Sequence, residues 1–117
     1  MHELAIADSI VRIAGEHAGG RPVTRVEVRV GHLRQVVPSA LAFGFELVAE
    51  GTPVEGAELV IVDVEAVGRC GTCGDETRLV EFPLACRSCG SLDVEVIQGE
   101  ELYVDSLELE EALAASA

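Results

Sequence analysis

The 117-residue sequence contains no lysine and no tryptophan, and it has only one tyrosine and three phenylalanines. Eight arginines are therefore its only permanently cationic side chains, against 21 aspartates and glutamates, and the net charge is −13. Binding to nucleic-acid phosphates or to an anionic membrane requires clustered basic residues, so the composition argues against both. It favours cationic partners, metal ions included. Because aromatic residues make up only 3% of the chain, its core must be aliphatic.

Long apolar runs and a secretory signal are also absent. A membrane-spanning helix needs about 20 consecutive apolar residues, and the longest apolar run here is only a few residues. The first residues do not combine a cationic region with a long apolar one, as a signal peptide would. We therefore expect a soluble, cytoplasmic protein with no membrane partner. Thiols stay reduced in the cytoplasm, so the four cysteines predict metal ligands or a redox centre and not a disulfide framework.

Two amphipathic helices are predicted. Apolar residues at three- and four-residue spacing predict a helix over residues 3–17, which ends at Gly19. A second helix is predicted over residues 38–50, and Gly51 ends it. Gly44 lowers the intrinsic helix propensity of this second segment.

Alternation of apolar and polar residues predicts three strands, over residues 24–30, 57–66 and 102–109. The last strand carries Asp105 and Ser106 in its middle, which is consistent with a bulge. The segment between the second and third strands holds all four cysteines and has too few apolar residues to form a core. Something other than hydrophobic burial must therefore hold it together.

The cysteines form two C-x-x-C-G motifs with twelve residues between the pairs. Cys70 and Cys73 belong to the first motif, and Cys86 and Cys89 belong to the second. A tight turn across each pair aims both sulfurs at one point, and two such knuckles make a tetrahedral cage of four thiolates. This pattern predicts a structural Zn(II) site. We therefore predict an α+β fold: a small mixed three-stranded sheet with two helices, residues 1–67 plus 100–117, and an inserted zinc-ribbon domain, residues 68–99.

The cysteine pattern has three other possible interpretations. A rubredoxin-like iron site also uses paired knuckles but covers its metal with aromatic rings, and this segment offers only Phe82. A thiol–disulfide centre requires one C-x-x-C at the start of a helix, and neither pair precedes a helical pattern. A zinc-ribbon interaction or nucleic-acid-binding module remains the alternative function. The charge argues against nucleic-acid binding, because Arg87 is the last basic residue and eight acidic residues follow it, beginning with Asp93.

The start of the chain offers a different kind of site. Met1 is retained when a residue as bulky as histidine follows, which leaves a free α-amine. That amine, the deprotonated amide nitrogen of His2 and the His2 imidazole Nδ1 can form fused chelate rings around one ion, in the square-planar nitrogen geometry that Ni(II) and Cu(II) prefer. Glu3 adds a carboxylate and another amide. By contrast, His17 at a helix end and His32 at a strand exit are expected to be ordinary solvated residues.

Motifs along nearly the whole chain resemble the HypA/HybF family of hydrogenase maturation factors. The motifs that carry this resemblance are Met1-His2-Glu3, Val26-Glu27-Val28-Arg29-Val30-Gly31, Val37-Pro38, Leu41-Ala42-Phe43-Gly44-Phe45-Glu46, Gly56-Ala57-Glu58-Leu59, the two C-x-x-C pairs and Leu102-Tyr103-Val104-Asp105-Ser106-Leu107-Glu108.

The resemblance implies a nickel metallochaperone. It places nickel, a transferable cargo, on Met1, His2 and Glu3, and structural zinc on the four cysteines. It implies delivery of Ni(II) to the large subunit of a [NiFe]-hydrogenase in concert with the GTPase HypB, by a monomer or weak homodimer. Unlike some relatives, this chain has no histidine after His32. We predict no enzymatic activity, because the sequence has no phosphate-binding glycine loop and no nucleophile with an identifiable base.

Overall fold

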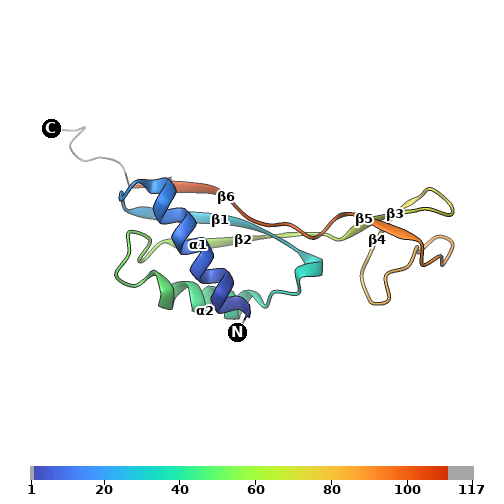
Figure 1. Cartoon of the computed structure of the whole chain (residues 1–117), viewed down its shortest axis with the longest axis horizontal. Coiled ribbons are helices and arrows are strands. Elements are labelled where there is room, and N and C mark those ends of the chain that lie inside the picture. The colour runs from blue at the N-terminus through green and yellow to red at the C-terminus, as the bar shows by residue number, and fades with distance from the viewer. Residues whose placement is uncertain (1, 111–117) are drawn as a thin grey trace. The chain divides into compact units, whose positions relative to one another are not determined.

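The computed structural model describes residues 2–110 and divides the chain into two compact units. Among the described residues, the first unit comprises residues 2–28, 36–62 and 103–110, and the second comprises residues 29–35 and 63–102. The elements are drawn in Figure 1. In chain order they are α1 (His2–Ala18), β1 (Val23–Gly31), the 3₁₀ helix η1 (His32–Arg34), α2 (Pro38–Ala49), β2 (Glu58–Val64), β3 (Val67–Cys70), β4 (Glu76–Arg78), β5 (Val94–Gln98) and β6 (Leu102–Leu109).

The first unit contains both helices and most of a three-stranded sheet in the order β2-β1-β6. β2 runs parallel to β1, and α2 forms the crossover that parallel strands require (Figure 1). β6 runs antiparallel to β1 (Figure 1). The predicted fold class, two helices with a small mixed sheet and an inserted cysteine module, is therefore confirmed. None of the described helices is long and apolar enough to cross a membrane.

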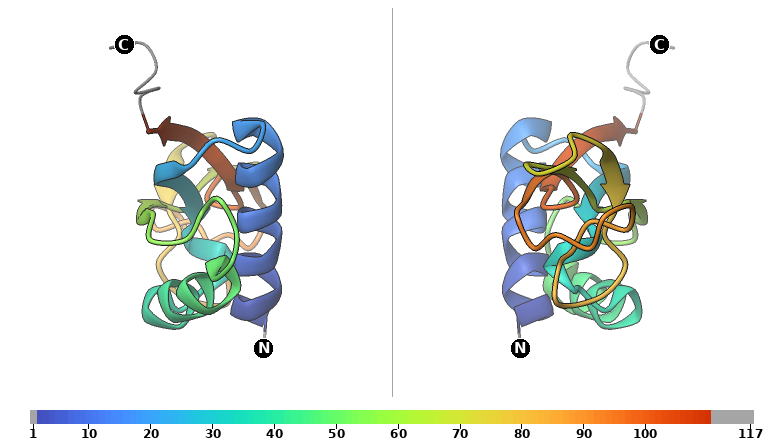
Figure 2. Two further views of the ribbon diagram at one scale, coloured as in Figure 1. Left: turned by 90° about the vertical axis from the view of Figure 1, so that its left-hand side faces the viewer. Right: turned by 90° about the vertical axis from the view of Figure 1, so that its right-hand side faces the viewer.

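The core of the first unit is aliphatic, as the composition required. The predicted inner face of α1 is buried at four positions, but Leu4 remains 46% exposed because it lies in the first turn, at the edge of the core. α1 and α2 pack against each other, with the first turn of α1 beside α2 (Figure 2). The buried side chains are those of Ala7, Ile10, Val11, Ala14 and Ala18 from α1, Val23, Val26 and Val28 from β1, Leu41, Phe45 and Ala49 from α2, and Val54.

The helix-weakening residue Gly44 has a packing role. It is buried, and a Cβ at this position would lie 3.4 Å from Ala7 Cβ and 3.4 Å from Leu4 Cδ1. The absence of a side chain thus brings α2 close to the first turns of α1. Tertiary packing compensates for the low helix propensity.

Charged residues lie on the other side of β1. Arg25 pairs with Glu27 at 3.2 Å, with Glu108 of β6 at 3.2 Å and with Glu58 of β2 at 3.9 Å. One arginine therefore links all three strands. The side chains of Glu58 and Glu108 are more than half exposed, and only that of Glu27 is largely covered. Exposed ion pairs add little stability, so these contacts contribute to strand register more than to stability.

The second unit is built on a separate three-stranded sheet in the order β4-β3-β5. β3 pairs antiparallel with both neighbours. The buried residues of the second unit include two of the four cysteines, Cys70 and Cys86, together with Ala66 and Leu79. Because so few apolar side chains are buried, the cysteine cluster takes the place of a hydrophobic core, as the sequence predicted.

Candidate metal sites

The four cysteine sulfurs converge on one point. Their Sγ atoms all lie within 4.8 Å of one another, and both Cys70–Cys89 and Cys73–Cys86 are separated by 3.6 Å. These distances exclude disulfide bonds, which require about 2.05 Å between sulfurs. They fit the edge of a tetrahedron around zinc, since Zn–S bonds of about 2.3 Å place two sulfurs about 3.8 Å apart. The sequence-predicted ligands therefore form a metal-binding geometry.

The two knuckles are copies of one backbone turn. In the first, the Cys70 N–H donates to the carbonyl of Asp75 at 2.9 Å and the Gly74 N–H donates to the carbonyl of Cys70 at 3.0 Å. Gly74 has a φ of +82°, a left-handed conformation that glycine adopts without steric cost. The second knuckle repeats these bonds with Cys86 to Ser91 at 2.9 Å, Gly90 to Cys86 at 2.8 Å and a φ of +80° at Gly90.

Backbone amides inside each turn point at the first sulfur. The Cys73 N–H donates to Cys70 Sγ at 3.4 Å and the Thr72 N–H donates to the same sulfur at 3.3 Å. The Cys73 N–H, aided by that of Thr72, lowers the pKa of Cys70 to about 6. The Cys89 N–H similarly lowers the pKa of Cys86. Each knuckle thus presents one thiol that is readily ionised.

The second thiol of each knuckle behaves in the opposite way. The Asp75 N–H alone would lower the pKa of Cys73, but burial and the adjacent Cys86 and Cys70 thiols raise it to about 12. The Ser91 N–H alone would lower the pKa of Cys89, but the Cys70 sulfur, burial and the Cys86 sulfur together raise it. Four thiolates cannot crowd together without a cation between them. The array is therefore suited to a divalent metal that displaces the remaining protons.

The second unit contains no tyrosine or tryptophan and a single phenylalanine. Phe82, the one phenylalanine nearby in sequence, is 62% exposed. The cover that a rubredoxin-like iron site uses is thus absent from this part of the chain, and the donor set fits a metal such as zinc.

The predicted nickel residues lie at the start of α1. His2 is its first residue and is exposed, and Glu3 is half-buried in the first turn. Met1 lies outside the described residues. Within residues 2–110, the only cluster of three or more histidine, cysteine or acidic groups with metal-binding spacing is the cysteine cluster. A site at the terminus must therefore draw on backbone nitrogens.

Glu3 makes a contact that the sequence did not reveal. Its Oε2 accepts a hydrogen bond from the Val37 N–H at 3.0 Å. Donation by Val37, followed by the Glu3 backbone N–H and the nearby His2 charge, lowers the pKa of the Glu3 carboxyl below its ordinary value of 4.5. No local sequence signal could have identified this pair, because the two residues are 34 positions apart.

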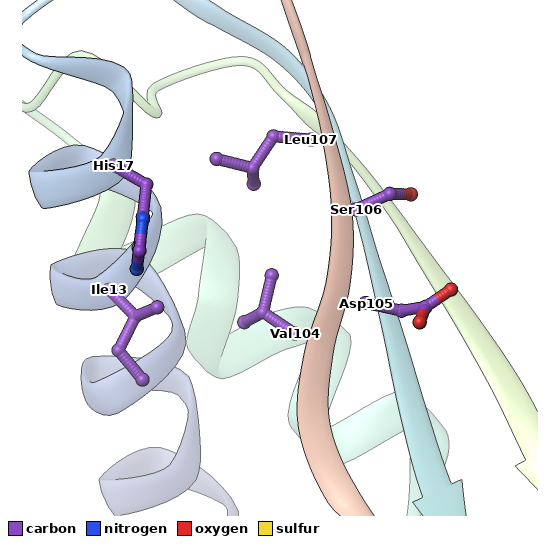
Figure 3. Close-up of a pocket in the computed structure, with 6 residues that line it drawn as sticks. All are labelled: Ile13, His17, Val104, Asp105, Ser106 and Leu107. Atoms are coloured by element: carbon purple, nitrogen blue, oxygen red, sulfur yellow. The ribbon is translucent and has the colours of Figure 1, made fainter.

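The other two histidines are exposed and do not join a metal site. His17 lines a pocket of about 350 Å³ between α1 and β6 in the first unit. Figure 3 shows that Val104 and Leu107 point towards α1 there, whereas Asp105 and Ser106 point away from it. Two consecutive residues therefore lie on the outer side of β6 (Figure 3), which is consistent with the predicted bulge. They also leave His17 without a second ligand in this pocket.

The paired cysteine knuckles, carried on a small unit built on a three-stranded sheet, define a metal-binding protein of the zinc-ribbon type. Residues 1–109 match the family model described as "Hydrogenase/urease nickel incorporation, metallochaperone, hypA". The chain belongs to this HypA family.

Relatives along the whole length agree. The chain is 44% identical over 110 residues to "Hydrogenase maturation factor HypA" of Geotalea uraniireducens, covering 94% of this chain and 100% of the relative. It is 40% identical over 111 residues to the same factor of Rippkaea orientalis, covering 95% and 97% of the two chains. The solution structure of the Ni metallochaperone HypA from Helicobacter pylori superposes with a TM-score of 0.66 at 28% identity, over 92% of this chain and 96% of that one.

Membership defines the general role. The chain is a nickel-incorporation metallochaperone of hydrogenase maturation, and it is a maturation factor and not an enzyme. The resemblance inferred from the sequence motifs is thereby confirmed.

Proposed function

We propose that this chain binds Ni(II) at its N-terminus through Met1, His2 and Glu3 and delivers it to the large subunit of a [NiFe]-hydrogenase, in concert with the GTPase HypB. The observation that carries the proposal is the position of His2 and Glu3 in the first turn of α1. The first four N–H groups of a helix have no intrahelical acceptor. Coordination by the His2 amide nitrogen therefore breaks no hydrogen bond of the helix.

The electrostatics of the terminus require anionic ligands. A helix N-terminus carries a partial positive charge, which disfavours a bare cation. A deprotonated His2 amide offsets this charge and the metal charge together. The chain's net charge of −13 further favours the approach of Ni(II) over that of anions.

Release follows from the same ligand set. One in-plane position remains open after the α-amine, the His2 amide and the His2 imidazole are bound, so a partner ligand can enter by substitution. Protons compete for the amine, with a reference pKa of about 7.7 to 8.0, and for the imidazole, at about 6.5. Mild acid should therefore favour release.

The test is a Ni(II) titration followed by the absorbance of the square-planar d–d band. We expect stoichiometric binding by the native chain, and loss of it in His2→Ala and in protein whose α-amine is blocked. His17→Ala is the matched control, since His17 is exposed on the same helix. Unchanged titration of His2→Ala, or of the blocked protein, would overturn the N-terminal assignment.

The proposal includes a second, structural metal. Zn(II) is held by Cys70, Cys73, Cys86 and Cys89 in a zinc-ribbon domain of residues 68–99, inserted into a nickel-binding domain of residues 1–67 and 100–117. A closed four-thiolate site leaves no open position, so zinc supports folding and nickel is the cargo. The protein acts in the cytoplasm, where reduced thiols keep the zinc site intact, as a monomer or weak homodimer.

A further inference from the structure

The hydrogen bond between Glu3 and Val37 joins the starts of the two helices. Val37 is the N-cap of α2, with φ −84° and ψ 112°, and no side chain caps α2 from that position. The Glu3 Oε2 that accepts the Val37 N–H, at 3.0 Å, comes from the first turn of α1. A carboxylate of one helix thus lies at the N-terminus of the other, where negative charge is favourable.

The sequence of α2 explains why an outside carboxylate is used. In a capping box, a Glu or Gln three residues after the N-cap reaches back to the N-cap N–H. In α2 that position is occupied by Ala40, which has no acceptor. Glu3 supplies the missing carboxylate from α1.

Packing holds the donor and acceptor together. Gly44 of α2 faces Leu4 and Ala7 of α1, so the first turns of α1 lie against α2 along more than one contact. The Glu3 side chain lies next to these contacts in sequence and is half-buried. Its orientation towards α2 is therefore supported by neighbouring apolar contacts as well as by the hydrogen bond.

We propose that Glu3 is a positioning residue: its carboxylate braces the first turn of α1 against the N-cap of α2 and so holds His2 and the start of the chain in place for the metal. This inference rests on the proposed nickel site at the terminus. It assigns the carboxylate a partner within the protein, Val37, and leaves the terminal nitrogens to hold the metal. The brace orders residues 2 and 3 before nickel arrives, which reduces the conformational entropy lost on chelation.

The brace can be removed without altering any nickel ligand. Val37→Pro deletes the donating N–H, and the backbone of Val37 is extended and close to the φ of proline. The Val37 side chain is 52% exposed, so its replacement costs little packing. Val37→Ala is the matched control because it shortens the side chain but keeps the N–H.

We expect Val37→Pro to weaken Ni(II) binding about three- to tenfold, the effect of losing one hydrogen bond of this kind, while Val37→Ala stays at the native affinity. Glu3→Ala, which keeps its backbone amide, should weaken binding to the same extent as Val37→Pro. The double variant should be no weaker than either single one, because both remove the same interaction. If Val37→Pro left affinity unchanged or raised it while Glu3→Ala lowered it strongly, the carboxylate would be a nickel ligand and the brace would be refuted.

A metal-free measurement separates the brace from the nickel assignment. The Val37 amide proton should shift upfield and exchange faster in Glu3→Ala than in the native chain, as observed by NMR without any metal. An unchanged Val37 amide would overturn the brace whatever nickel does. Normal nickel binding by His2→Ala would instead overturn the proposed site and leave the Val37 result untouched.

Discussion

Gly31 lies directly against the peptide group of Gly99. A Cβ on Gly31 would overlap the Gly99 carbonyl, and it would be 2.6 Å from the Glu100 nitrogen. The Gly31 N–H donates to the Glu101 carbonyl at 2.6 Å, and the Leu33 N–H donates to the Gly99 carbonyl at 2.9 Å. The end of β1 and the β5–β6 link are therefore joined backbone to backbone, in a space that admits no side chain.

This contact predicts the effect of adding one methyl group. Gly31→Ala should reduce the free energy of unfolding by about 1–3 kcal/mol, because the atoms it meets belong to the backbone and cannot rotate away. Urea denaturation followed by circular dichroism measures the change. Gly15→Ala is the control: no atom lies within 4 Å of its added Cβ, and replacing glycine inside α1 should stabilise the protein by about 0.5–1 kcal/mol. Equal stability of Gly31→Ala and the native protein would contradict the close approach.

Removal of one proposed zinc ligand tests the second unit. Cys73→Ser should abolish stoichiometric zinc and unfold residues 68–99, because the cysteines replace a hydrophobic core there. The amide resonances of the first unit should largely persist in a heteronuclear NMR spectrum. Ser88→Ala, an exposed change inside the second knuckle, should keep both zinc and fold. Iron and a red colour in untreated protein would establish a rubredoxin-type site in place of zinc.

The Glu3 carboxyl gives a pH-dependent signal in the metal-free protein. Its pKa in the folded chain is lowered below 4.5, mainly by the Val37 N–H. The ionised carboxylate therefore stabilises the fold at pH values above 4.5, and this contribution is lost as pH falls through the lower, folded-state pKa. The Val37 amide proton should titrate with a midpoint below 4.5. A midpoint at or above 4.5 would show that the hydrogen bond does not favour the ionised form.

The nucleic-acid alternative predicts salt-sensitive retention on DNA or RNA. We expect none at physiological salt, because nine acidic residues outnumber the five arginines of the second unit, and at least two of these arginines are paired with carboxylates. Arg69 contacts Glu76 at 3.1 Å, and Arg78 contacts Glu65 at 3.2 Å. Retention on immobilised DNA that decreases steeply with added salt would revive the alternative.

The sequence predicted the regular elements well because their signals are local. The helix predicted over residues 3–17 is observed as α1, His2–Ala18, and the strand predicted over residues 24–30 is observed as β1, Val23–Gly31. The interruption of the alternation in β6 was also visible, since Asp105 and Ser106 are two consecutive polar residues. The three short strands of the second unit and η1 were not predicted, because elements of three to five residues carry too little periodicity.

The cysteine site was equally accessible to the sequence. Spacing alone placed Cys70, Cys73, Cys86 and Cys89 around one point, because each C-x-x-C-G turn is determined by its own five residues and its glycine. What the sequence could not give is the contrast between the thiols. The lowered pKa of Cys70 and the raised pKa of Cys73 depend on which amides and which sulfurs face each other across the two knuckles.

By itself, the sequence determined an acidic chain with an aliphatic core, two helices, a small sheet, a four-cysteine metal motif and a terminus suited to nitrogen coordination of a metal ion. These features depend on residue types and short spacings. The tertiary structure decided which distant residues meet: Glu3 with Val37, Gly44 with Ala7, and Gly31 with Gly99. Such pairs are 34 or more residues apart, so only the folded packing of helices and strands brings them together.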